Sequence, residues 1–197
     1  MASPRMKFPS KVLVPKGGEI YCHIFENDNI GLARCLFWSI TVDFAPVKYG
    51  ENEFSCSMTS EWIPWPVRDW RELDGKLLDV DYGENGIESS FYMTEHDTGT
   101  HTKLVLHRSG ENVFTVCWDM LVDFHGFYGG DANPAMPVHA EVDVQYIGLL
   151  ITPDNLSPKP TTPTMLRTVA SEFVDLTVYE GPEPRGSHGS IFRPATF

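Results

Sequence analysis

The stretch FWSITVDF at residues 37–44 returns in altered form as CWDMLVDF at residues 117–124, and each copy ends in Val-Asp-Phe. Apolar side chains alternate with others in both copies, and Trp38 and Trp118 share the apolar positions. Because successive side chains of a strand point to opposite faces, this period of two predicts two half-buried β-strands. The repeat is consistent with a duplication, and equally with two central strands that met the same packing demand independently.

Other segments extend the pattern on both sides of each copy. The alternation is clearest at residues 138–146, VHAEVDVQY, and strand-like segments joined by the turn-like NDNIG and SGEN precede the two copies. Late in the chain, Thr162 has the character of an N-cap before Pro163, and apolar side chains then repeat at helical spacing. The sequence therefore predicts a mainly β fold. We expect an antiparallel β-sandwich or partly closed barrel of roughly seven to nine strands, with one α-helix at about 163–175.

The length and composition predict a single domain over residues 1–197. At 42% hydrophobic residues, the chain carries enough apolar surface to bury one sizeable core. Three segments are expected to lie outside regular structure. They are a flexible N-terminus at 1–10, a Pro-rich loop at 152–162 and a Gly/Pro-rich tail at 180–197, which we expect to contribute at most an edge strand.

The formal net charge of −12 restricts the class of partner. Nucleic acids and anionic membranes both need basic side chains to neutralise phosphates, so neither is expected. An acidic surface either keeps the protein soluble or attracts a basic protein partner. No apolar run has the length of a membrane span or a signal-peptide core, which predicts a cytoplasmic protein.

Cysteine usage agrees with a reducing compartment. The four cysteines form no CxxC pair, so we expect reduced and mostly buried thiols. Cys22 and Cys35 flank the turn-like NDNIG, and a disulfide between them would require suitable geometry and an oxidising setting.

A cluster of aromatic side chains marks a candidate partner-binding site. The segment EWIPWPVRDW at residues 61–70 contains Trp62, Trp65 and Trp70 together with Arg68, and its prolines forbid a central strand. Exposed Trp and Arg are typical of interaction hot spots. The alternative is that this segment closes one end of the fold and buries its indoles. The loop at 125–134 adds two more candidate contact residues, Phe127 and Tyr128.

Imidazole and carboxylate side chains suggest a divalent-metal site as an alternative. His125, His139 and Glu141 lie on or near the polar face of two strands, and His139-Ala-Glu141 with His188 has the order of a two-His, one-carboxylate facial triad. The competing interpretation is a solvated outer face, where charged residues are routine. The chain has no GxSxG motif, P-loop or GxGxxG motif, and we predict no other cofactor.

Two functions follow from these patterns. The first is a non-enzymatic binding protein, such as an acidic inhibitor or immunity-type protein that blocks a basic protein partner. The second is a small-ligand- or metal-binding β-barrel. One form of this hypothesis is a metal-dependent enzyme that uses the polar face at 119–143.

Overall fold

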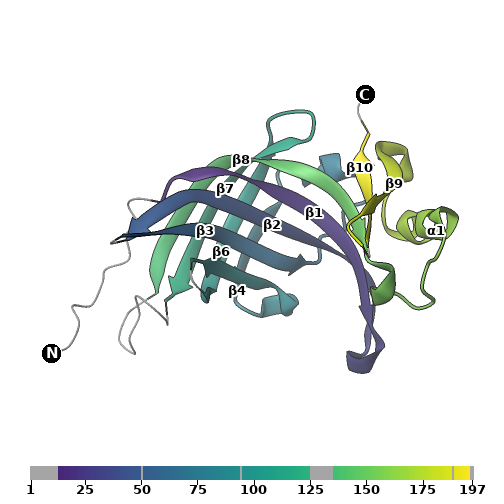
Figure 1. Ribbon diagram of the computed structural model, residues 1–197, viewed down its shortest axis with the longest axis horizontal. Coiled ribbons are helices and arrows are strands. Elements are labelled where there is room, and N and C mark those ends of the chain that lie inside the picture. The colour runs from purple at the N-terminus through teal and green to yellow at the C-terminus, as the bar shows by residue number, and fades with distance from the viewer. Residues whose placement is uncertain (1–12, 50, 94, 125–134, 188, 196–197) are drawn as a thin grey trace.

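The computed structural model describes residues 13–49, 51–93, 95–124, 135–187 and 189–195 (Figure 1). This part of the chain forms one ten-stranded sheet, with one α-helix and several short 3-10 turns. The strands are β1 (Pro15–Asn27), β2 (Leu32–Tyr49), β3 (Asn52–Ile63), β4 (Leu77–Asp81), β5 (Glu88–Tyr92), β6 (His96–Arg108), β7 (Val113–Asp123), β8 (Met136–Ile151), β9 (Tyr179–Arg185) and β10 (Gly189–Pro194). The helix is α1 (Pro163–Phe173), and the 3-10 turns are η2 (Asp28–Ile30), η3 (Trp70–Leu73), η4 (Glu84–Gly86), η5 (Pro153–Asn155) and η6 (Leu176–Val178).

Seven of the strands close into a barrel, which confirms the expected fold class. They follow the order β1-β2-β3-β5-β6-β7-β8, and β8 returns to pair with β1 in parallel, whereas every other pairing is antiparallel. Closure removes the free edges that an open sheet would present. Three strands lie outside the closed barrel. β4 pairs with β6, β10 pairs with β8, and β9 pairs with β10.

The alternating pattern of the two echoed stretches determines which side chains fill the barrel. Trp38 and Trp118 are both fully buried, on β2 and β7, while Asp119 is exposed on the outer face. At about 25 cal/mol per Å² and roughly 150–250 Å² per aromatic ring, each indole stabilises the core by several kcal/mol of gross burial. On β8, Val138, Ala140 and Tyr146 are buried as predicted.

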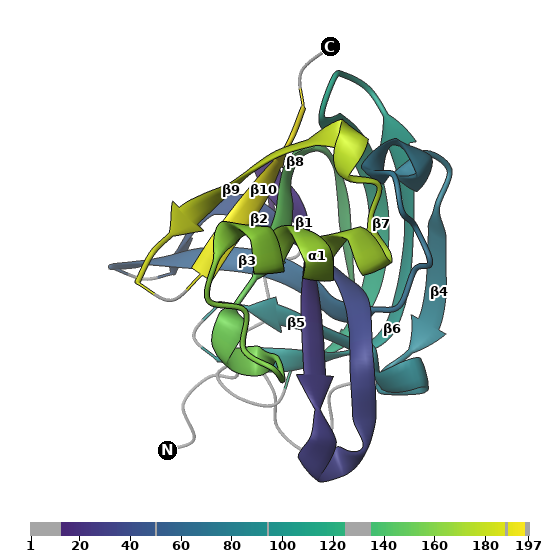
Figure 2. The same ribbon diagram turned by 90° about the vertical axis from the view of Figure 1, so that its right-hand side faces the viewer.

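The helix begins as predicted and ends slightly earlier. The Thr162 hydroxyl accepts a hydrogen bond from the Met165 N–H at 3.3 Å, and Pro163 occupies the first turn. The buried face of α1 joins the barrel core, and Figure 2 shows α1 lying across one end of the barrel. The 180–197 segment contributes β10 and most of β9, so it contains a full hairpin, with β9 at its edge.

Other details differ from the sequence-based expectation. β6 begins at His96, which is the cross-strand partner of Tyr92 on β5, and it continues to Arg108. Cys22 points into the barrel and pairs across the strands with Trp38, whereas Cys35 is opposite Phe25, and all four cysteines are free. The expected flexible segment 1–10 lies outside the described residues. Within them, no helix has the length and apolar character needed to span a membrane.

Candidate functional site

An irregularity near the end of β3 decides where Trp62 points. Trp38 pairs with Ile63 and Ile40 with Ser60, so Glu61 and Trp62 together occupy the place of one residue opposite β2. Such a bulge redirects side chains. Ser60 and Ile63 are buried, and strict alternation between them would turn Trp62 into the barrel. The bulge instead leaves the Trp62 side chain on the outer face.

The backbone of Trp62 adopts a conformation that a bulky residue rarely takes. Its φ of 63° lies in the left-handed region, which costs a residue with a Cβ about 1–2 kcal/mol. Asn85, with φ of 55°, is the other non-glycine residue with positive φ among the described residues. Strained backbone is typical of ligand-binding positions, and Trp62 and Asn85 line the same groove.

Aromatic side chains gather around Trp62 on the outside of β1 and β2. The Trp62 ring lies 5.1 Å from His23, 5.2 Å from Phe25 and 5.4 Å from Phe37 between centroids, each edge to face. Tyr21 extends the row, 6.0 Å from His23. Each such pair contributes about 0.5–1.5 kcal/mol beyond its burial. This outer aromatic cluster is separate from the interior core and holds Trp62 against the barrel wall.

A groove of about 320 Å³ opens beside the outer aromatic cluster and is lined by residues of the β1–β2 hairpin. Figure 2 shows this hairpin projecting from the barrel. We call the groove the Trp62 groove. Ile30, at the hairpin tip, lines it and is 74% exposed. A second, polar groove of about 510 Å³ adjoins it, since Glu88 lines both. The polar groove is lined by Thr41, Thr59, Glu61, Tyr82, Glu88 and His96, among others.

Carboxylates lie beside the outer aromatic cluster and along the grooves. Burial raises the pKa of the Tyr21 phenol, and the Glu61 and Glu19 carboxylates act in the same direction, against the Ser39 hydrogen bond and the Arg185 charge. His23 is neutral at physiological pH, because burial lowers its pKa to about 4. Its Nδ1 atom has no hydrogen-bond partner among the described residues. An aromatic surface with carboxylates beside it is suited to an apolar group that carries a positive charge.

Trp65 and Arg68 lie elsewhere, at the seam between the barrel and α1. A groove of about 440 Å³ there is lined by both residues. The Arg68 guanidinium donates hydrogen bonds to the carbonyl oxygens of Ser171 and Glu172, at 2.9 and 3.0 Å, near the C-terminus of α1. Cations stabilise the negative end of a helix, so Arg68 already has a structural role. Arg34, which also lines this seam, is paired with Glu26 at 3.0 Å.

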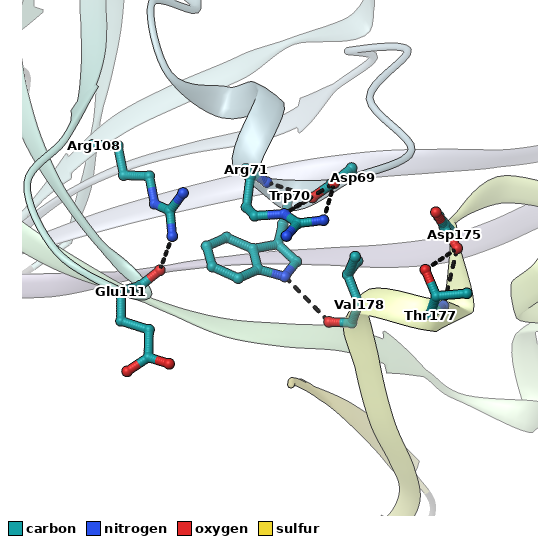
Figure 3. A network of polar contacts seen from close by, with 8 residues as sticks. All are labelled: Asp69, Trp70, Arg71, Arg108, Glu111, Asp175, Thr177 and Val178. Atoms are coloured by element: carbon teal, nitrogen blue, oxygen red, sulfur yellow. Dashed lines mark hydrogen bonds and ion pairs between the residues drawn. The ribbon is translucent and has the colours of Figure 1, made fainter. Parts of the chain in front are cut away.

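Trp70 lies in the interior, and Figure 3 shows its ring between Arg108 and Val178. Its side chain is 1% exposed, and its indole N–H donates to the carbonyl oxygen of Val178 at 3.3 Å. The ring stacks on Tyr146 at 5.5 Å, and the Arg108 guanidinium lies 5.1 Å from its centroid. In this arrangement Trp70 closes the barrel end, and its indole is not at the surface for a partner.

The remaining predicted site residues are only partly described. Phe127, Tyr128 and His125 lie outside the described residues, as does His188. His139 and Glu141 are exposed on the outer face of β8, and the His139 Nδ1 atom lies 2.8 Å from an Asp119 oxygen. Within the described ranges, His, Cys, Asp and Glu side chains form no group of three that could hold a metal ion.

Sequence reasoning missed four members of the outer aromatic cluster and both groove carboxylates. A signal for the aromatics was present, since Tyr21, His23 and Phe25 occupy the positions of β1 that alternation assigns to the outer face. Glu61 and Glu88 meet only through the pairing of β3 with β5, which no local pattern indicates. A search of protein-family models, curated proteins and solved structures found no match to this chain.

Proposed function

We propose that this chain is a non-enzymatic binding protein that docks on a basic protein partner through the Trp62 groove, in the manner of an acidic inhibitor or immunity-type protein. The observation that carries the proposal is the placement of Trp62. A bulge and a left-handed backbone direct a large apolar side chain to the outer face, although the interior core does not include it. Ring contacts hold Trp62 in this place, and a docking surface accounts for the strained backbone that the placement requires.

Charge supports the choice of partner. The chain carries a net charge of −12, and no lysine or arginine lines the Trp62 groove in the described part of the chain. The seam beside Trp65 is a weaker candidate, because its arginines are already bound to carboxylate and carbonyl oxygens of this chain. Specific interfaces bury about 1,600 Å² in total, so the groove would be the centre of a larger contact.

Selection of peptides from a random displayed library on the purified protein tests this function. We expect enriched peptides to combine basic and apolar residues and to bind more weakly as salt rises. Ile30→Ser should weaken their binding about tenfold or more, because Ile30 lines the groove yet is too exposed to support the fold. Leu121→Ser, at an exposed apolar position on β7, is the matched control and should bind normally. Failure to enrich such peptides, or equal binding to both variants, would refute the proposal.

A further inference from the structure

Two carboxylates of like charge face each other across β3 and β5 at the junction of the two grooves. Glu61 is the direct cross-strand partner of Glu88. The preceding pair, Ser60 and Ser89, points into the barrel and shares a hydrogen bond of 3.0 Å between its hydroxyls. Because side chains alternate, Glu61 and Glu88 both point outward, and both line the polar groove. Like charges directly opposite each other destabilise a sheet, so the fold itself does not explain this pair.

Two other outer-face carboxylates have a cationic or imidazole partner. Asp79 lies 2.9 Å from the Lys103 ammonium, and Asp119 lies 2.8 Å from His139. Within the described ranges, Glu61 and Glu88 form no ion pair. Among the described residues, no lysine or arginine lines either groove. The junction therefore combines an apolar groove on one side with two uncompensated negative charges on the other.

We propose that the partner segment places an apolar side chain in the Trp62 groove and an adjacent arginine between Glu61 and Glu88. This inference rests on the proposed function and specifies its ligand. One guanidinium would offset the repulsion of both carboxylates and pair with each through its planar set of donors. Exposed Tyr82 and His96 also line the polar groove, and aromatic faces stack on guanidinium better than on the compact ammonium of lysine.

The cation subsite can be tested without the partner. Carbon-13 NMR of the glutamate carboxyl groups would be recorded while N-acetyl-arginine amide is added, with the lysine and norleucine analogues in parallel. We expect saturable shifts at Glu61 and Glu88 that are largest for the arginine compound and absent for norleucine. Glu61→Gln should weaken this binding about fivefold or more, whereas Glu141→Gln, at an exposed carboxylate on β8, should not change it. Equal responses to arginine and norleucine would overturn the inference.

Peptides from the library selection test the arginine subsite separately from the proposed docking function. Replacing the arginine of an enriched peptide by norleucine should weaken binding about tenfold to wild type but little to Glu61→Gln/Glu88→Gln. If binding requires Ile30 yet ignores both glutamates, the proposed function stands and the arginine subsite is wrong. If the arginine compound binds at the glutamates while no peptide is enriched, the subsite stands and docking of a protein partner fails.

Discussion

Replacing Trp62 with glycine and with alanine should reverse the usual order of stability. In an ordinary strand, glycine is about 0.5–1 kcal/mol less stable than alanine, because its unfolded chain is more flexible. At φ of 63°, alanine instead pays the left-handed penalty of about 1–2 kcal/mol, and glycine does not. Both variants lose the same three ring contacts of Trp62. The glycine variant should therefore be the more stable of the two by about 0.5–1 kcal/mol.

Urea unfolding at neutral pH measures this difference, provided that the two variants unfold with equal dependence on urea concentration. Trp65 supplies the control, because it lies in the same segment and does not have a positive φ. There, alanine should be at least as stable as glycine. If Trp62→Ala equals or exceeds Trp62→Gly in free energy of unfolding, the left-handed conformation is wrong, and the bulge does not direct Trp62 outward.

Three further predictions concern charged and titratable groups. Glu61→Gln should stabilise the free protein by about 0.2–1 kcal/mol in urea unfolding, because it removes repulsion from Glu88, and a destabilised variant would contradict the unpaired arrangement. Burial lowers the pKa of His23 from 6.5 to about 4. Between these two pH values the unfolded chain binds a proton that the folded chain does not, so the free energy of unfolding falls as the pH drops from 6.5 to 4. Between neutral pH and pH 4, the free energy of unfolding of the wild type should fall by about 3 kcal/mol more than that of His23→Phe. Equal pH dependence of the two proteins would refute this. Arg68→Ala should cost about 1–2 kcal/mol and expose α1 to proteolysis, leaving peptide binding intact; unchanged stability and protection would argue against its role at the helix end.

Local patterns predicted much of the framework. The period of two placed Trp38 and Trp118 in the core, and the Thr162-Pro163 pair marked the start of α1. These features depend on residues close in sequence, so a single chain reveals them. Closure of the barrel depends on the parallel pairing of β1 with β8, between segments more than a hundred residues apart. The sequence therefore left both a sandwich and a partly closed barrel open.

The candidate site was harder to predict for a related reason. Trp62 was identified as a contact residue together with Trp65 and Trp70, but the segment gave no sign that the three indoles separate to the outer face, the helix seam and the core. A bulge with positive φ usually carries glycine or asparagine, and here it carries tryptophan. The acidic pair depends on strand register, which tertiary packing determines.

The most direct test of the Trp62 groove is fluorine NMR of protein labelled with 5-fluorotryptophan, during titration with an enriched arginine-containing peptide. The chain has 5 tryptophans, and the buried Trp38, Trp70 and Trp118 serve as internal controls. We predict that the Trp62 resonance shifts and saturates with the peptide, while the three buried resonances stay in place. A peptide that binds and shifts only Trp65, or that leaves Trp62 unchanged, would contradict docking at this groove.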